Sequence, residues 1–476
     1  MNSNESHQKL NRTVIANGFC IGCGACAVPK DSPFKVKMDE YGQYQSYLAD
    51  SGVFAKTETN YEQLCPFGDD APNEDELAKR RFSDSCDYNP QAGYFKGIYA
   101  GHVAEGSFRQ NGSSGGMGTW IIHELLAKGL VDYVLHVKSE GDEKHTDNIP
   151  FKYSVSDTLE EIQEGAKSRY YPIQLSEVLQ TVLEKAGRYA VVGLPCFIKS
   201  IRLLQAQDSV FAERISYCIG LVCGHLKSAH YAESLAWQMG ISPEELKSID
   251  FRRKDLSQPA NRYNTYARGT TGEKVKQTSQ LFGTDWGAGT FKYKACDFCD
   301  DVFAETADIV MGDAWLPEYV DDSLGTNIVV SRNEDIELLI QKACNEGRLE
   351  FTPLGVKKAI ESQDAGLRHR KIGIIDRLDF ERKASSWVPT KRVSVGGRKS
   401  SKLEIKKQEL RVKMRNLSHE SFKQAKTDKD INIYFSQMMP VYNRYKKIGL
   451  TLKVRLKAKV KLLIFKKLEL IGYKRS

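Results

Sequence analysis

Three cysteines near the N-terminus have the residue type and spacing of metal ligands. Cys20, Cys23 and Cys26 form a C-x2-C-x2-C run in which most intervening residues are glycine or alanine. Small residues let the backbone turn tightly and direct N–H groups at sulfur, as in the ferredoxin runs that hold 4Fe–4S clusters. The usual continuation to a fourth cysteine is missing, and Cys65-Pro66 supplies that pattern instead. We therefore expect one 4Fe–4S cluster, with zinc as the alternative, although zinc sites usually separate two C-x2-C pairs.

A second cysteine group is less specific. Cys296 and Cys299 form a lone C-x2-C pair, which needs two further ligands to hold a cluster. The candidates are Cys196, Cys218 and Cys223, of which Cys196 and Cys223 each follow a predicted strand. Ligands gather at the carboxyl ends of strands in open α/β sheets. The alternative is that these cysteines are simply small buried residues, which is our expectation for Cys218.

A glycine-rich loop, residues 111–118, lies between a predicted strand at 97–104 and a predicted helix at 119–128. Another strand is predicted at 131–137, so the segment resembles an α/β unit. Backbone N–H groups of such a loop and the following helix N-terminus can bind phosphate. The loop has neither Walker nor dinucleotide-fingerprint spacing, so an ordinary loop and helix cap remains the alternative.

The composition and the N-terminal sequence bear on the cellular compartment of the protein. Its 476 residues are 41% hydrophobic and 27% charged, and include 11 cysteines. No apolar run is long enough to span a bilayer, and the N-terminus lacks the apolar segment of a secretory signal. We therefore expect a cytoplasmic protein, where thiols stay reduced and grouped cysteines indicate ligation rather than disulfides.

Basic residues concentrate at the C-terminus. Residues 391–476 contain 25 Lys and Arg against 6 Asp and Glu, whereas the remainder is mildly acidic. Such asymmetry is typical of a surface-binding appendage. Residues 450–470 mix lysines with apolar residues and favour a helix, which could contact an anionic membrane surface and make the protein peripheral to it. A protein partner is the equal alternative, and nucleic acid is disfavoured.

The predicted organisation has four parts. Residues 1–75 form a small ferredoxin-like domain with strands at 34–38 and 44–48, and the acidic stretch 69–76 is a linker. Residues 90–180 and 181–385 form a mixed α/β core, with strands at 189–193, 215–222 and 307–313 and a helix at 197–204. Residues 390–476 form a basic, mainly helical extension. The expected fold class is therefore α+β or α/β.

Several motifs together resemble the beta subunits of coenzyme F420 (deazaflavin) hydrogenases and dehydrogenases. In the family's order, over residues 15–330, they are C-I-G-C-G-A-C from Cys20, S-S-G-G-M-G-T-W from Ser113, A-K-S-R-Y from Ala166, G-L-P-C-F from Gly193, L-V-C-G-H from Leu221, and C-D-F-C-D with A-D-I-V-M-G-D-A-W between Cys296 and Trp315. Two departures stand out: Arg169 replaces a common lysine, and Phe197 replaces a common glutamine.

The resemblance implies cofactors and site residues. It implies a bound flavin, FAD, and a second 4Fe–4S cluster held by Cys196, Cys223, Cys296 and Cys299. The flavin phosphates would approach Ser113, Ser114, Gly115 and Gly116. Further flavin-site residues would be Lys167, Ser168 and Tyr170, near the isoalloxazine or its substrate, and Asp313, which would support the site.

The expected function follows from these parts. We expect an iron–sulfur flavoprotein oxidoreductase that passes electrons between clusters, a flavin and a small-molecule substrate or electron carrier. One alternative is an electron-transfer subunit that acts with a redox partner protein and has no substrate chemistry of its own. Another is a cluster- or zinc-stabilised binding protein that uses its basic tail.

Overall fold

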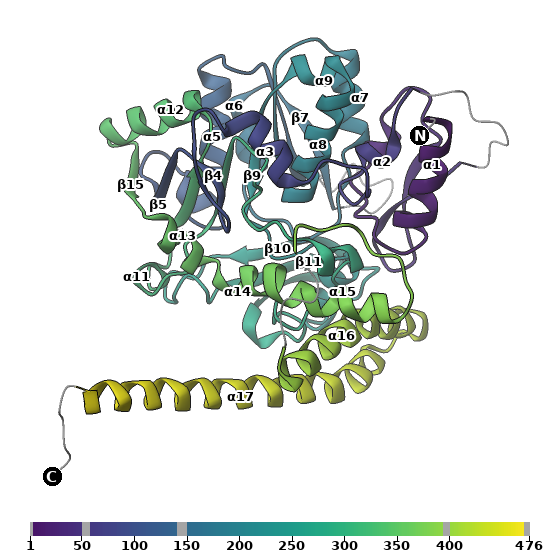
Figure 1. Cartoon of the computed structure of the whole chain (residues 1–476), viewed down its shortest axis with the longest axis vertical. Coiled ribbons are helices and arrows are strands. Elements are labelled where there is room, and N and C mark those ends of the chain that lie inside the picture. The colour runs from purple at the N-terminus through teal and green to yellow at the C-terminus, as the bar shows by residue number, and fades with distance from the viewer. Residues whose placement is uncertain (1–2, 50–57, 140–149, 394–399, 471–476) are drawn as a thin grey trace.

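The computed structural model describes residues 3–49, 58–139, 150–393 and 400–470. Its centre is a mixed eight-stranded sheet in the order β15-β5-β14-β13-β9-β8-β6-β7 (Figure 1). Strands β6, β8, β9 and β13 run parallel, and the outer pairs are antiparallel. The strands are β5 (Gly97–Val103), β6 (Tyr133–Ser139), β7 (Phe151–Ser156), β8 (Tyr189–Gly193), β9 (Ile215–Leu221), β13 (Ile309–Asp313), β14 (Asn327–Ser331) and β15 (Leu349–Pro353).

Helices cover both faces of this sheet, which confirms the expected mixed α/β class. Successive side chains of a strand point to opposite faces. On β8, Ala190 accordingly packs into the core that contains Trp120, whereas Val191 packs into the core that contains Phe197. The principal covering helices are α5 (Met117–Ala127) and α12 (Glu334–Asn345) on the first face, and α7 (Ser176–Glu184), α8 (Pro195–Gln207) and α9 (Ser209–Arg214) on the second.

The N-terminal part packs against the second face. The predicted hairpin is confirmed as β1 (Phe34–Met38) and β2 (Tyr44–Leu48), accompanied by α1 (Ser3–Leu10) and α2 (Tyr61–Leu64). The Leu175 N–H donates to the Cys23 carbonyl at 2.8 Å, and Gln180 donates to the Val28 carbonyl at 2.8 Å. These bonds join the first cysteine loop to the start and middle of α7.

The predicted linker at 69–76 is wrong from residue 74 onward. Helix α3 (Glu74–Phe82) begins there because Asn73 and Glu76 form a reciprocal capping box. Asp69 is also fixed, since it accepts hydrogen bonds from Trp387 and Thr390. The acidic residues of this stretch therefore serve helix capping and long-range contacts.

A smaller antiparallel sheet, β10 (Leu246–Arg253), β11 (Asn264–Gly269) and β12 (Gly272–Gln277), packs with α10 (Ala229–Trp237). The C-terminal helices α16 (Lys402–Asp428) and α17 (Ile431–Leu470) contribute to this core through side chains such as Phe422 and Tyr434. The segment joining the core to α16 contains α13 (Val356–Ser362), α14 (Asp364–Leu367), the turn η5 (Arg368–Ile372) and α15 (Gly373–Lys383). The basic extension is thus part of the packed body at least to Tyr445.

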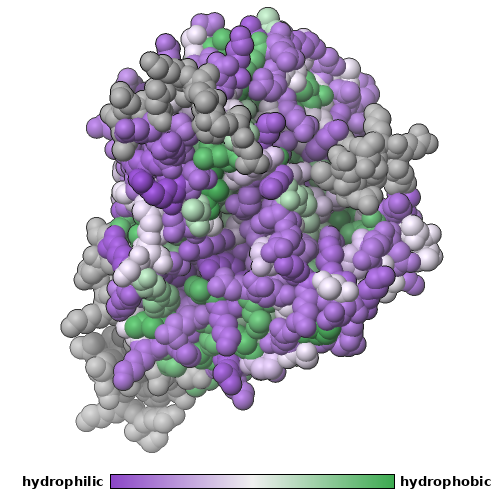
Figure 2. Space-filling view, turned by 90° about the vertical axis from the view of Figure 1, so that its right-hand side faces the viewer, coloured by the Kyte–Doolittle hydropathy of each residue, from purple (hydrophilic) through white to green (hydrophobic). Residues whose placement is uncertain are grey.

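Beyond the body, α17 continues as a projecting helix (Figure 1). The helix prediction for 450–470 is confirmed, but the side chains of 451–453 and 455–470 lie outside the described residues, and so does the proposed membrane contact. Among the described helices, none combines the length and apolarity needed to cross a bilayer. The face in Figure 2 is mostly hydrophilic, with small scattered hydrophobic areas.

Candidate functional site

The first four predicted ligands share one buried environment. Ser46 on β2 contacts two of them: its N–H donates to Cys20 Sγ at 3.4 Å, and its Oγ lies 3.1 Å from Cys26 Sγ. Burial raises the pKa of the Cys65 thiol, and the neighbouring Cys23 and Cys20 raise it further. The structure therefore brings Cys65 to the C-x2-C-x2-C run, as its Cys-Pro pattern predicts.

The glycines of this run have the expected role. Gly22 adopts φ +66°, and its N–H donates to Cys20 Sγ at 3.3 Å. A Cβ atom on Gly22 would lie 2.3 Å from the Tyr44 carbonyl oxygen. A larger residue would therefore separate the cysteine loop from β2.

The second group assembles from three distant segments. Cys196 stands in the first turn of α8, Cys223 follows β9, and Cys296 and Cys299 lie at the short helix η4 (Lys294–Phe298). Burial raises the pKa of the Cys196 thiol well above its usual value, and Cys299, Cys223 and Cys296 raise it further. The Leu226 N–H donates to Cys296 Sγ at 3.3 Å.

Cys218 lies apart from this group. It is fully buried in strand β9, on the face opposite Ile219. Burial raises the pKa of its thiol, and the charges that modify this effect come from Arg202, Asp308 and Arg81. Cys218 is therefore a core residue, as expected.

The two cysteine groups are neighbours. Cys23 of the first group contributes to the raised pKa of Cys196 in the second. Tyr153 is near a cysteine of each group: burial raises the pKa of its hydroxyl, and both Cys196 and Cys23 raise it further. The two groups are therefore close enough to interact electrostatically at Cys23 and Cys196.

The sulfur atoms are not arranged around single points. Within the described residues, no three His, Cys, Asp or Glu side chains form a site for one metal ion. A cubane distributes four cysteine sulfurs over separate iron atoms, whereas a mononuclear site gathers its ligands around one ion. The feature that fits a cluster is therefore the donor set. Each group has four free thiols, all buried except the partly buried Cys26, Cys65 and Cys196. Backbone N–H groups are directed at sulfur in both groups.

The glycine-rich loop lies at the edge where β8, β9 and β13 end, here called the carboxyl edge. Asn327 at the start of β14 accepts a hydrogen bond from the Met117 N–H at 3.0 Å, and Ser114 donates to the Thr326 carbonyl at 3.1 Å. The Ser168 N–H donates to Ser113 Oγ at 2.8 Å. The loop and the 166–170 segment, separated in sequence, thus meet as the resemblance implies.

Two glycines of the loop fit positions where side chains do not. Gly116 has φ +91°, and a Cβ there would lie 2.7 Å from the Arg109 backbone nitrogen. A Cβ on Gly115 would lie 2.8 Å from both Asn327 Oδ1 and the Gly101 carbonyl oxygen. The sequence of the loop is therefore required by its own packing, independently of any ligand.

The remaining predicted flavin residues surround the same region. Both carboxylate oxygens of Asp313 accept hydrogen bonds from Arg252, at 2.7 and 2.8 Å. Lys167 has φ 110° and lies 3.4 Å from Asp250. The Tyr170 ring packs edge-on against Trp286, with centroids 4.9 Å apart. Asp313 therefore acts on the site through Arg252.

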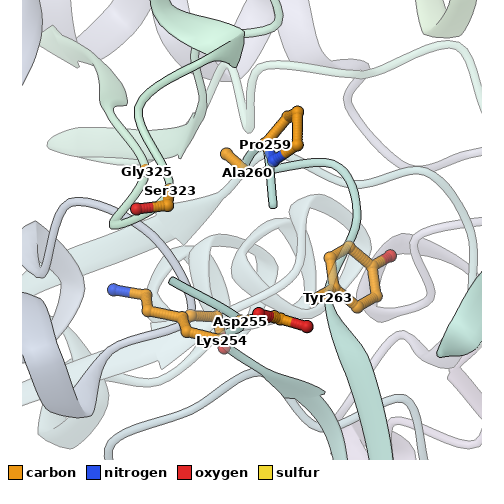
Figure 3. Close-up of a pocket in the computed structure, with 8 residues that line it drawn as sticks. Lys254, Asp255, Pro259, Ala260, Tyr263, Ser323 and Gly325 are labelled. Atoms are coloured by element: carbon orange, nitrogen blue, oxygen red, sulfur yellow. The ribbon is translucent and has the colours of Figure 1, made fainter. Parts of the chain in front are cut away.

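A small pocket, open to solvent, lies beside the loop (Figure 3). Lys254 extends into this region, and its ammonium donates to the Ser114 carbonyl at 2.9 Å and to the Arg109 carbonyl. Burial lowers the pKa of Lys254 to about 7, and the neighbouring cations Lys167, Arg109 and Arg252 add to the effect. Arg252, Lys167 and Arg109 pair with Asp313, Asp250 and Asp322. Lys254 donates to backbone carbonyls, so it is the cation of this group with which an anion would pair. The other lining residues are Ser113, Asp255, Pro259, Ala260, Tyr263, Ser323 and Gly325.

Aromatic rings connect the pocket region to the second cysteine group. The His225 ring, two residues after Cys223, lies 4.5 Å from the Trp286 ring, which in turn packs on Tyr170. Sequence reasoning missed Arg252, Lys254 and Trp286. The basic run Arg252-Arg253-Lys254 at the end of a strand was the available signal.

Two family models match, one for the N-terminal and one for the C-terminal part of the coenzyme F420 hydrogenase/dehydrogenase beta subunit. The N-terminal model matches residues 98–180, and the C-terminal model matches residues 186–357. The chain belongs to the coenzyme F420 hydrogenase/dehydrogenase beta subunit family. This confirms the resemblance over the α/β core, and it makes the protein a relative of electron-transfer subunits of oxidoreductases.

Among solved structures, one similar chain comes from "Xenon derivatization of the F420-reducing [NiFe] hydrogenase complex from Methanosarcina barkeri". That match is 17% identical, covers 63% of this chain and 96% of the other, and has a TM-score of 0.47. No curated protein sequence matched. The family match leaves out residues 1–97, which include the first cysteine group, and the segment after residue 357.

Proposed function

We propose that this family member is an iron–sulfur flavoprotein that passes electrons between two 4Fe–4S clusters, a flavin and an external carrier or substrate. The observation that carries the proposal is a linear order of three groups. The first cysteine group adjoins the second at Cys23 and Cys196, and the rings of His225 and Trp286 lead from the second group to Tyr170. Two residues before Tyr170, the Ser168 N–H donates to Ser113 of the glycine-rich loop. Redox centres in such an order suit electron transfer.

The chemistry of the donors supports the cluster assignment. Cysteine binds metal as thiolate, and burial opposes thiolate formation until a metal supplies positive charge. A metal would therefore supply the positive charge that thiolates need in these surroundings. Two sets of four would hold the clusters: Cys20, Cys23, Cys26 and Cys65 in the first, and Cys196, Cys223, Cys296 and Cys299 in the second.

The charge around the loop supports the flavin assignment. Lys254 would offset negative charge of a diphosphate, beside Lys167 and Arg109, which also pair with Asp250 and Asp322. The N–H groups of Ser114, Gly115 and Gly116 would supply further donors. A bound flavin would exchange electrons in pairs while clusters exchange them singly. Asp313 keeps Arg252 in position, and Tyr170 and Trp286 exclude water between loop and cysteines.

The experiment is anaerobic purification of the full chain with quantitation of iron, sulfide and flavin. We expect about eight iron atoms per chain, the content of two 4Fe–4S clusters, and one FAD. Protein that stays colourless after reconstitution with iron, sulfide and FAD would contradict the proposal. It would favour the binding-protein alternative, for which zinc content is the matching measurement.

Family membership favours a second candidate, an electron-transfer subunit without its own substrate. Family members are beta subunits, so a redox partner protein is the natural donor or acceptor. A steady-state assay with a viologen donor separates the two functions. Reduction of a deazaflavin or another organic two-electron acceptor by the isolated chain supports an autonomous oxidoreductase, whereas exchange with one-electron dyes alone supports the electron-transfer role.

A further inference from the structure

A buried arginine contacts the second cysteine group. Arg370, in the turn η5, is 1% exposed. Its Nη2 donates to the carbonyls of Cys223 and Gly224 at 3.1 and 2.8 Å and lies 3.6 Å from Cys223 Sγ. One buried guanidinium thus contacts a sulfur and two backbone carbonyls of the second group.

No acid pairs with this arginine directly. Among the residues that the structure describes, no carboxylate oxygen lies within 4.0 Å of the Arg370 guanidinium, and its Nε is buried without a hydrogen-bond partner. A buried unpaired charge is costly. The cysteine sulfurs are the groups placed to balance it.

The surrounding segment fixes Arg370 in position. Arg377 on α15 donates to the His369 carbonyl at 2.8 Å and to the Asp297 carbonyl at 2.8 Å, which ties η5 to the C-x2-C loop. The Asp297 carboxylate in turn accepts from Lys292 and from Arg415 of α16, the latter at 2.5 Å. Arg370, Arg377 and Arg415 all lie beyond residue 357, where the family match ends. They therefore lie outside the region that the family models match.

We propose that Arg370 is a positioning residue whose fixed charge favours the reduced state of a cluster held by Cys196, Cys223, Cys296 and Cys299. The inference rests on the proposed function. Reduction adds one negative charge to a cluster, and net charge and hydrogen bonds to sulfur set cluster potentials. Because Arg370 is buried, water screens this attraction weakly. Through Arg370, the C-terminal extension would thus help to set the reduction potential of this cluster relative to the other redox centres.

The test is an EPR-monitored redox titration of the anaerobically prepared full chain. One electron passes from dithionite, through mediator dyes, to each oxidised cluster, and dithionite is oxidised to sulfite. Wild type is compared with Arg370→Gln, which removes the charge, and Arg370→Lys, which keeps it. Arg332→Gln is the matched control, because Arg332 is equally buried and bonds only backbone carbonyls, including those of Ala307 and Phe303. The second cluster's signal is identified by its loss in Cys299→Ser.

We expect Arg370→Gln to lower the reduction equilibrium constant of the second cluster about tenfold, which is about 59 mV for a one-electron couple. The first cluster should not change, and Arg370→Lys and Arg332→Gln should stay close to wild type. Loss of the second signal in Arg370→Gln with retention in Arg370→Lys would also support the role of charge.

Three results would overturn the inference: no shift in Arg370→Gln, equal shifts in both Arg370 variants, or loss of the second cluster from both. In these cases the second cluster would depend on the shape of the Arg370 guanidinium or not on Arg370 at all, and its charge would not set the reduction potential. A wild-type chain that shows no second cluster signal would instead refute the proposed function itself, so the two failures are distinguishable.

Discussion

The Arg252–Asp313 pair at the carboxyl edge gives a quantitative prediction. Replacing Asp313 by Asn keeps the side-chain volume but removes the charge that balances Arg252. The two side chains are 6% and 19% exposed and bond through both oxygens. Breaking a buried pair by removing one partner costs about 3–5 kcal/mol. Because Asp313 retains some contact with solvent, we expect the lower end, about 3 kcal/mol of unfolding free energy.

The assay is urea unfolding of the full chain, followed by tryptophan fluorescence, since the Arg252 guanidinium lies 5.8 Å from the Trp315 ring. The control is Asp379→Asn, which breaks an exposed pair with Lys383 whose side chains are 42% and 74% exposed. Exposed helix pairs contribute about 0.3–0.5 kcal/mol. A double-mutant cycle with Arg252→Gln should give a coupling energy of about 1–3 kcal/mol.

The expected result is refuted if Asp313→Asn lowers the unfolding free energy no more than Asp379→Asn, or if the double-mutant cycle shows no coupling. Asp313 would then not hold Arg252. A direct contact of Asp313 with a ligand would become the better explanation of its place in the family motif.

Three further predictions concern the proposed cofactor sites. Burial lowers the pKa of Lys254 to about 7, and an anion favours its protonated form, so FAD affinity should fall as pH rises from about 6 to about 8. Calorimetry should show this fall of affinity with pH in wild type and its loss in Lys254→Met. The same pH dependence in both proteins would refute the role of Lys254. Gly116→Ala should destabilise the chain by about 1–3 kcal/mol in thermal unfolding, because Gly116 has a positive φ. Gly118→Ala should be neutral, since its Cβ would meet nothing closer than 4.0 Å. Equal effects of the two substitutions would contradict the role of the Gly116 backbone conformation. Cys65→Ser should reduce iron from about eight to about four atoms per chain, while Cys218→Ser should retain it; full iron in the former would remove Cys65 from the ligand set.

Part of the positive charge of the C-terminal extension has an internal role that its sequence does not reveal. A basic excess indicated an appendage for an external surface. In the structure, Arg415 pairs with the buried Asp297 and Lys426 pairs with Glu233. Part of the positive charge therefore neutralises the chain's own acidic body, and overall charge balance could not reveal this because it carries no information about pairing.

Local patterns in the sequence determined a large share of this protein. Alternation and helical period located β1, β2, β5, β8, β9 and α8, since these signals depend only on neighbouring residues. The C-x2-C-x2-C run and its glycines likewise indicate three of the four proposed ligands of the first group from local spacing. Family motifs added the glycine loop, which lies within residues 98–180 matched by the N-terminal family model.

Tertiary structure alone decided what the distant pieces form together. Cys196 and Cys223 meet because β8 and β9 are parallel neighbours whose carboxyl ends share one edge. Lys254 reaches the glycine loop from the second sheet, and Arg370 returns to Cys223 across 147 residues. Such contacts arise from packing between elements far apart in sequence, so no local spacing encodes them.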